Sequence, residues 1–203
     1  MIDFAALSDV NLLAYRDNIR QQDIVAKKQE ILDSIYQFHN LVPTSVLFVG
    51  FNPAILSCKA RTIAVTEISP DARDFLSERN VNFTYIDTRD LVNYRKQFQV
   101  VVAMEEYFTF ADSDQDQQNK IAKICNLATA FVISTVRDYK NQDFKEREFS
   151  SPALVRNGKD TKVFLENHDW DLKDRTRWNT MVYEISEPSS SLVTYGEFER
   201  RTM

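Results

Sequence analysis

Glycine is scarce in this sequence: only Gly50, Gly158 and Gly196 occur among 203 residues. Loops that cradle phosphates need several glycines, because a residue without a Cβ atom lets the backbone approach a ligand closely and adopt positive φ. The sequence therefore excludes a P-loop and a dinucleotide-binding fingerprint. If the protein binds a nucleoside, we expect that ligand to lack a pyrophosphate.

Cysteine and positive charge are also limited. Cys58 and Cys125 have neither paired spacing nor companion histidines, so we predict no structural zinc, no other metal site and no disulfide framework. The formal net charge of −5 argues against a strongly basic nucleic-acid binder. No apolar run approaches the roughly 20 residues that span a bilayer, and the N-terminus lacks the features of a signal peptide. We expect a soluble, cytoplasmic protein with no membrane partner.

What the sequence does contain is an alternation of helical spacing and short apolar runs. A helical region is predicted over residues 8–40, and Ser69-Pro70 is a typical helix start, an N-cap followed by proline at the first helical position. Another helix is predicted to open at residues 112–114. Five strands are predicted at residues 46–49, 62–66, 81–86, 98–103 and 130–135. This alternation predicts parallel βαβ units with right-handed crossovers.

The character of the chain changes after Thr135. Residues 137–160 are polar and are predicted to be irregular, and three further strands follow at 162–165, 181–185 and 192–195. The last two can pair antiparallel. The predicted fold class is α/β and Rossmann-like, with a mostly parallel sheet, an antiparallel C-terminal hairpin and an N-terminal helical extension. The extension would comprise residues 1–42 and the Rossmann-like domain residues 43–203.

Polar residues stand where the first three predicted strands end. The first strand leads into Gly50-Phe51-Asn52-Pro53, the second ends at Glu67 and the third at Asp87. In doubly wound folds, ligands bind outside the carboxyl ends of parallel strands, and an acid about 20 residues past the first turn holds ribose hydroxyls. The pattern therefore predicts a nucleoside-containing ligand.

This order of strands and acids resembles the class I S-adenosylmethionine-dependent methyltransferases. The resemblance implies S-adenosylmethionine as cofactor and a methyl acceptor that is a small molecule, a protein or a nucleic acid. It also implies roles for individual residues: Gly50, Phe51 and Asn52 near the methionine part, Glu67 on the ribose hydroxyls, and Asp87 and Thr88 near the adenine amine. Met104, the last of the implied cofactor-binding residues, would lie with Glu105 on the reaction side. Glu105 or Glu106 would accept a proton if the reaction requires it.

Two segments depart from the family pattern. Phe51, Pro53 and Ala54 stand where the family usually has glycines. The fourth strand ends in residues 104–107, Met-Glu-Glu-Tyr, without the Asn/Asp-Pro-Pro-aromatic run that holds the target amine in the amino-methylating enzymes. This argues against methylation of adenine or cytosine amines. The depleted glycine loop also leaves a second interpretation, a non-catalytic Rossmann-like scaffold or binding protein.

A third interpretation comes from a second resemblance. Residues 46–54 are similar to the Gly-Ile-Asn-Pro-Gly motif of mismatch-specific uracil-DNA glycosylases, in which the asparagine positions a water to attack a flipped nucleotide. Residues 188–191, Pro-Ser-Ser-Ser, are similar to that family's second motif. However, the segment after Asn52 lacks the family's aromatic and glycine-rich base pocket, and the net charge opposes DNA binding.

Several other groups can carry chemistry. Glu105 and Glu106 can act as a general base or as metal ligands, although adjacent side chains diverge and at most one should face the site. Residues 107–110 can wall a substrate pocket or pack under the sheet edge. His39 lies near a helix end, where a cation favours the helix dipole. His168 is either an exposed loop residue or a general base oriented by Asp169. Residues 137–141, with Arg175, Arg177 and Trp178, can bind an anionic or nucleic-acid substrate.

Overall fold

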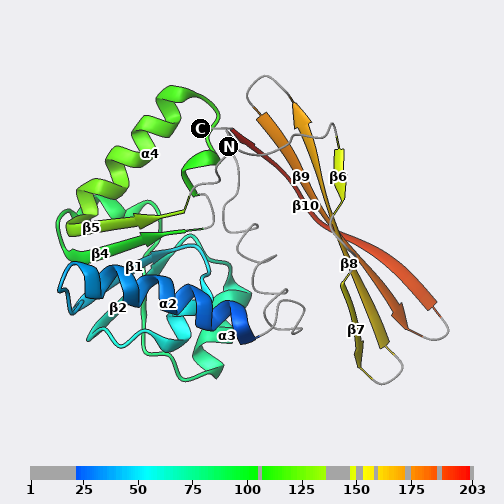
Figure 1. Ribbon diagram of the computed structural model, residues 1–203, viewed down its shortest axis with the longest axis horizontal. Coiled ribbons are helices and arrows are strands. Elements are labelled where there is room, and N and C mark those ends of the chain that lie inside the picture. The colour runs from blue at the N-terminus through cyan, green and yellow to red at the C-terminus, as the bar shows by residue number, and fades with distance from the viewer. Residues whose placement is uncertain are drawn as a thin grey trace.

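A computed structural model describes most of the chain. The described residues are 22–104, 107–135, 147–149, 153–157, 160–171, 175–186 and 189–201. They form two separate five-stranded sheets, one parallel and one antiparallel, and helices accompany the parallel sheet (Figure 1).

The first sheet is parallel throughout the described residues. Its strands have the order β3-β2-β1-β4-β5, so the chain runs outward from β1 to β3 and then crosses back to β4 beside β1. Their bounds are β1 Ser45–Val49, β2 Thr62–Thr66, β3 Thr84–Tyr85, β4 Phe98–Ala103 and β5 Ala128–Ser134. The predicted Rossmann-like parallel sheet is therefore confirmed. The third strand is much shorter than the predicted 81–86, because only two of its residues pair with β2.

Two of the α-helices begin at serine residues that cap them. The Oγ atom of Ser69 accepts a hydrogen bond from the Ala72 amide at 3.0 Å, and Pro70 occupies the first turn. Ser113 caps the next helix in the same way. The α-helices are α2 Gln22–Phe38, α3 Pro70–Glu78 and α4 Asp114–Leu127, and the short 3₁₀ helices are η1 Pro53–Ser57, η2 Asp90–Tyr94 and η3 Tyr107–Thr109.

The core lies on both faces of the parallel sheet. Leu47 and Val49 of β1 point to a cluster that includes Ile124 of α4, while Val46 and Phe48 point to a cluster that includes Leu32 of α2. These four side chains of β1 are all buried, and β4 divides its valines between the two clusters in the same way. Strands covered on both faces are apolar at every position rather than at alternate ones. This explains the continuous apolar runs in the sequence.

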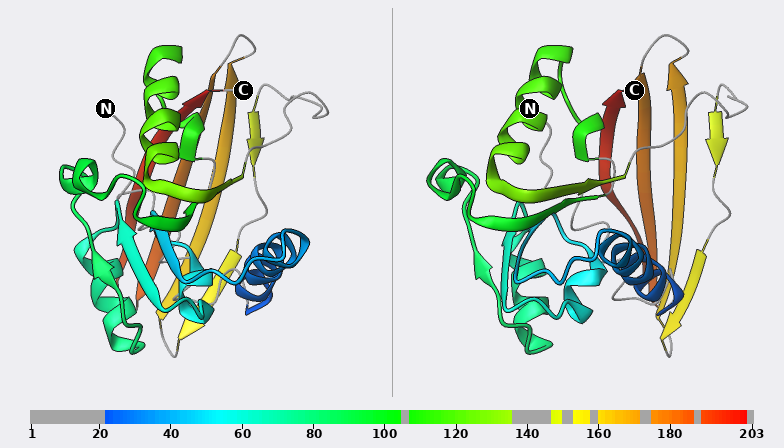
Figure 2. Two further views of the ribbon diagram at one scale, coloured as in Figure 1. Left: turned by 90° about the vertical axis from the view of Figure 1, so that its left-hand side faces the viewer. Right: turned by 60° about the vertical axis from the view of Figure 1, so that its left-hand side comes forward.

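The second sheet is antiparallel and stands apart from the first (Figure 2). Its strands are β6 Arg147–Phe149, β7 Ala153–Asn157, β8 Asp160–Asp171, β9 Arg175–Ser186 and β10 Ser189–Arg201. The order is β10-β9-β8-β6, and β7 pairs with another part of β8. The predicted strands at 162–165, 181–185 and 192–195 fall inside β8, β9 and β10.

One prediction is not confirmed here, and two need correction. β9 and β10 pair antiparallel, but within this second sheet, so an antiparallel hairpin on the Rossmann-like sheet is not confirmed. Residues 147–149 and 153–157 form strands although the segment was predicted to be irregular, because both pair with β8. His168 lies in β8 opposite Trp178, and not in a loop.

Of the predicted N-terminal extension, residues 1–21 lie outside the described residues. The division into two domains remains a prediction.

No helix in the described part of the chain has the length and apolar character needed to cross a bilayer.

Candidate functional site

The register of the parallel sheet brings four of the predicted site residues to one edge. Tyr85 pairs with Val65, Val65 with Phe48, and Phe48 with Val102, so these four residues form one row across four strands. Asp87, Glu67, Gly50 and Met104 each follow a member of that row by two positions. They therefore stand side by side at the carboxyl ends of β3, β2, β1 and β4, on either side of the point where the strand order reverses. This is the edge at which ligands bind in open α/β sheets.

The loop after β1 begins at a glycine that its conformation requires. Gly50 has φ of 78°, in the left-handed region where a Cβ atom is unfavourable. Its amide donates to the Thr66 carbonyl at 2.9 Å, which holds the loop against the end of β2. The backbone at Gly50 is thus fixed and carries no side chain.

The two residues after Gly50 turn their side chains inward. Phe51 is 1% exposed, and its ring meets that of Phe75 edge-on at 5.9 Å between centroids. Asn52 is also buried. Its Oδ1 caps η1 by accepting from the Ala54 amide at 2.9 Å, and its Nδ2 donates to Sδ of Met104 at 3.3 Å. Asn52 and Met104, both predicted to bind the cofactor, are therefore in contact, while Phe51 offers a ligand its backbone rather than its ring.

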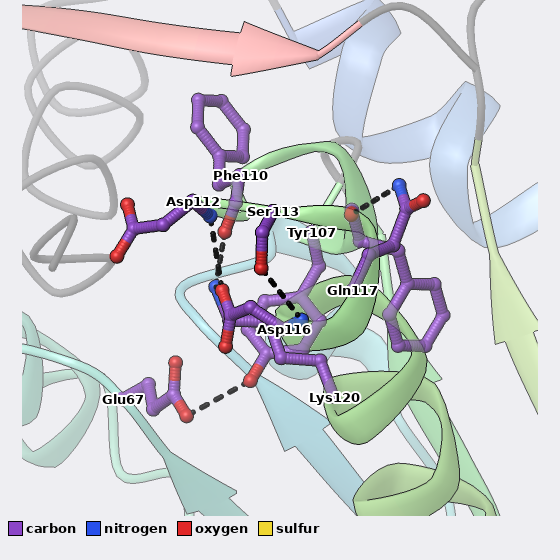
Figure 3. Close-up of polar contacts among 9 residues, drawn as sticks. Glu67, Tyr107, Phe110, Asp112, Ser113, Asp116, Gln117 and Lys120 are labelled. Carbon is purple, nitrogen blue, oxygen red and sulfur yellow. Dashed lines mark hydrogen bonds and ion pairs between the residues drawn. The ribbon is translucent and has the colours of Figure 1, made fainter.

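Glu67 stands directly after β2 in an unusual backbone conformation. Its φ is 54°, and a non-glycine residue in this region costs about 1–2 kcal/mol. The Tyr107 hydroxyl donates a hydrogen bond to Oε1 of Glu67 at 3.0 Å (Figure 3). Burial raises the pKa of Tyr107 well above its ordinary value, and the nearby Glu67 carboxylate raises it further. The phenol therefore remains a proton donor to Glu67 across the physiological range.

Asp87 is tied to a neighbouring arginine. Oδ1 accepts from both the backbone amide and Nε of Arg89 at 2.9 Å, and Oδ2 accepts from Nη2 at 2.8 Å. These hydrogen bonds, chiefly those of the guanidinium, hold the pKa of Asp87 well below its usual range. Asp87 is therefore ionised at neutral pH and its orientation is set by Arg89. Thr88, next to it, is half-buried.

The segment after β4 supplies a group that the sequence did not single out as a partner of Glu67. Met104 is buried, and residues 105–106 lie outside the described residues, so the roles predicted for Glu105 and Glu106 stay predictions. Phe108 and Phe110 are buried in the cluster below the sheet, which favours the packing interpretation for them. Tyr107 is 2% exposed and reaches the edge through its hydroxyl.

Polar contacts from α4 hold η3 in place (Figure 3). Lys120 donates to the Phe110 carbonyl, and its Nζ lies 5.7 Å from the centre of the Tyr107 ring. Gln117 donates to the Phe108 carbonyl at 2.9 Å. The Asp112 amide donates to Asp116 at 3.1 Å. The only sequence signal for this network is the helix start at residues 112–114 with acids in its first turn.

The other candidate groups lie elsewhere or are not described. His39 follows α2 and its ring contacts the ring of Phe131 at 4.6 Å between centroids. Residues 137–141 lie outside the described residues; Arg175, Arg177 and Trp178 belong to β9. A pocket of about 250 Å³ opens between α2 and the loop after η1, lined by Tyr36 and Cys58 among others, and none of the predicted site residues lines it.

Comparisons with known proteins support the fold. No family model and no curated protein sequence matches the chain. Solved structures do match. CalS10, an amino pentose methyltransferase from Micromonospora echinaspora whose structure holds S-adenosylmethionine, is 13% identical with a TM-score of 0.69, and the match covers 96% of this chain and 82% of that chain. The fold is that of class I S-adenosylmethionine-dependent methyltransferases.

Two further structures agree. An S-adenosylmethionine-dependent methyltransferase from Clostridium acetobutylicum is 12% identical, with a TM-score of 0.70 and coverage of 96% of this chain and 82% of that chain. The sugar N-methyltransferase KedS8 from a Streptoalloteichus species is 14% identical, with a TM-score of 0.73 and coverage of 94% and 77%. At these identities the similarity is one of fold.

Proposed function

We propose that the protein is an S-adenosylmethionine-dependent methyltransferase. The observation that carries this proposal is that Gly50, Glu67, Asp87 and Met104 stand side by side at the carboxyl edge of four neighbouring parallel strands. The structural neighbours that bind or use S-adenosylmethionine have the same fold. The edge, and not the pocket beside α2, is therefore the proposed cofactor site.

The residues present fit the cofactor in their chemistry. A ribose diol donates hydrogen bonds, and a carboxylate such as that of Glu67 is a pure acceptor with four lone-pair positions. An adenine amine also donates, and Asp87, two residues after Tyr85 of β3, is an ionised acceptor. The backbone at Gly50 can approach the methionine part closely, since no Cβ atom intervenes. When bound, S-adenosylmethionine would supply an electrophilic methyl group to a nucleophile.

The contribution of the chain would be positioning. Holding the donor and the acceptor in line converts a bimolecular reaction into an effectively unimolecular one. Glu105 or Glu106, directly after Met104, would accept the proton that a neutral nucleophile releases. The acceptor is left open among small molecules, proteins and nucleic acids; because two neighbours are described as acting on an amino pentose or a sugar nitrogen, an amino sugar is the first to test.

A second candidate is a non-catalytic scaffold or binding protein. Two observations favour it: the first loop has a single glycine, and the Asn52 side chain is already used to cap η1 and contact Met104. Fewer groups are then left to hold a methionine moiety than in a glycine-rich loop.

Calorimetric titration with S-adenosylmethionine and S-adenosylhomocysteine separates the two. Binding by the folded protein is expected, and Glu67→Ala should raise Kd roughly tenfold to a hundredfold because it removes charge-assisted hydrogen bonds. Glu78→Ala, an exposed acid at the end of α3, is the matched control and should bind as the wild type does. Absence of heat at high ligand concentration with a folded protein would favour the scaffold.

A further inference from the structure

We infer that Tyr107 is a positioning residue, which orients the Glu67 carboxylate toward the ribose hydroxyls of the cofactor. This inference rests on the proposed function and deepens it. Tyr107 lies on η3, beyond the end of β4 and 40 positions from Glu67 in the sequence, yet its hydroxyl is 3.0 Å from Oε1 of Glu67. It therefore joins the cofactor edge to the segment expected on the reaction side.

The contact is well defined on both sides. The Tyr107 ring is buried in the core cluster together with Phe108, so the phenol has little freedom to move. Glu67 leaves β2 at positive φ, a conformation that persists only where its surroundings enforce it. A phenol that remains protonated donates to the carboxylate at every pH at which the protein is expected to work.

The anchoring of η3 supports a positioning role. Lys120 donates to the Phe110 carbonyl and Gln117 donates to the Phe108 carbonyl, so the backbone is tied to α4 at two points just after Tyr107. Lys120 also lies beneath the Tyr107 ring at cation–π distance. These contacts, drawn in Figure 3, keep the hydroxyl at a fixed point beside Glu67.

The chemical consequence concerns ribose recognition. A carboxylate whose plane is fixed can accept hydrogen bonds from two adjacent ribose hydroxyls at once. A carboxylate that rotates freely spends less time in the orientation that accepts both. Sites with a supported and preoriented polar group discriminate strongly against a ligand that lacks the matching hydroxyl. Removing the Tyr107 hydroxyl should therefore weaken the preference for ribose over 2′-deoxyribose, and not simply weaken binding.

The test compares Tyr107→Phe with Tyr94→Phe. Tyr94 is half-buried, packs on the same cluster and stacks on Phe98. The Tyr94→Phe variant therefore removes the same hydroxyl group, but at a position that does not contact Glu67. The ligands are S-adenosylhomocysteine and its 2′-deoxy analogue, measured by calorimetry. We expect Tyr107→Phe to raise Kd for the ribose form roughly tenfold, the loss of about one hydrogen bond to a charged group, and to leave Kd for the deoxy form within about twofold. Tyr94→Phe should change neither.

The outcomes separate the two proposals. If the wild type binds neither ligand, the proposed function fails and this inference fails with it. If the wild type binds but Tyr107→Phe behaves as wild type, or loses affinity for both ligands equally, the positioning role is wrong and the proposed function stands. Should Tyr107→Phe fold poorly, Lys120→Met loosens η3 while keeping the phenol. The same loss of ribose preference then supports the inference, and an unchanged preference overturns it.

Discussion

Nδ2 of Asn52 lies 3.3 Å from Sδ of Met104, and this contact joins the segments that follow the neighbouring parallel strands β1 and β4. The same asparagine caps η1 through its Oδ1 atom. One buried side chain thus caps the backbone of η1 after β1 and contacts the Met104 side chain after β4, on the other side of the point where the strand order reverses. The shape of the candidate cofactor edge depends on it.

Asn52→Ala should destabilise the protein by about 1 kcal/mol or somewhat more, because it removes an N-cap and leaves the Ala54 amide without this acceptor. Urea unfolding monitored by circular dichroism measures the change. Asn52→Asp, which retains the capping oxygen, should recover part of the loss, and Asn93→Ala at an exposed position should cost little. Equal stability of Asn52→Ala and Asn93→Ala would contradict the role of the cap.

Gly50→Ala should also be destabilising, by about 1–2 kcal/mol, because φ is 78° at this position. The new methyl group would in addition stand at the cofactor edge, so affinity for S-adenosylhomocysteine should fall. The matched comparison is Asn80→Gly, since exposed Asn80 has φ of 57° and glycine tolerates that conformation. Asn80→Gly should be neutral or slightly stabilising. A Gly50→Ala variant as stable as the wild type would show that the loop does not need its left-handed turn.

The pH dependence of Asp87 follows from its pairing with Arg89. In the unfolded chain this carboxyl group titrates near its ordinary value of 3.8, and in the folded protein Arg89 lowers its pKa. The unfolded state therefore binds the proton more readily, so the stabilising contribution is complete above that value and is lost as the pH falls below it. Arg89→Ala should move the pKa of Asp87 back toward its ordinary value.

Carbon-13 NMR titration of the aspartate carboxyl groups measures this shift directly. Arg95→Ala, which removes an exposed arginine six residues further along the chain, is the control and should leave the titration of Asp87 unchanged. If Asp87 titrates identically in Arg89→Ala and the wild type, the bidentate contact between the Arg89 guanidinium and the Asp87 carboxylate is not populated in solution.

The parallel sheet could be predicted from sequence because its physical cause is local. Strands such as β1 and β4 are covered on both faces, so they appear as apolar runs, interrupted in β4 only by Gln99, between helix starts such as Ser69-Pro70. The acids at the strand ends followed from the same pattern, since parallel neighbours end at one edge. Glu67 and Asp87 occupy that edge as predicted.

The antiparallel sheet could not be predicted to its full extent. β8 continues through Glu166-Asn167-His168-Asp169, a polar stretch with no apolar alternation, because its backbone pairs with β9 along 12 residues. Such pairing depends on a partner distant in sequence and overrides local propensity. The Tyr107–Glu67 hydrogen bond was missed for a similar reason. It joins residues 40 positions apart, and only the packing of η3 brings them together.

The short length of β3 affects how readily molecules of this protein can associate through the edge of the parallel sheet. An outer strand with a long row of open amide and carbonyl groups invites a neighbouring molecule to add a strand, which is a common start of aggregation. At this rim only Thr84 and Tyr85 are paired in ladder form, and the guanidinium of Arg73 sits 4.4 Å from the centre of the Tyr85 ring. A second molecule could pair its backbone with only two residues of β3, and the Arg73 guanidinium lies over one of them. This edge of the sheet is therefore protected against the addition of a strand from another copy.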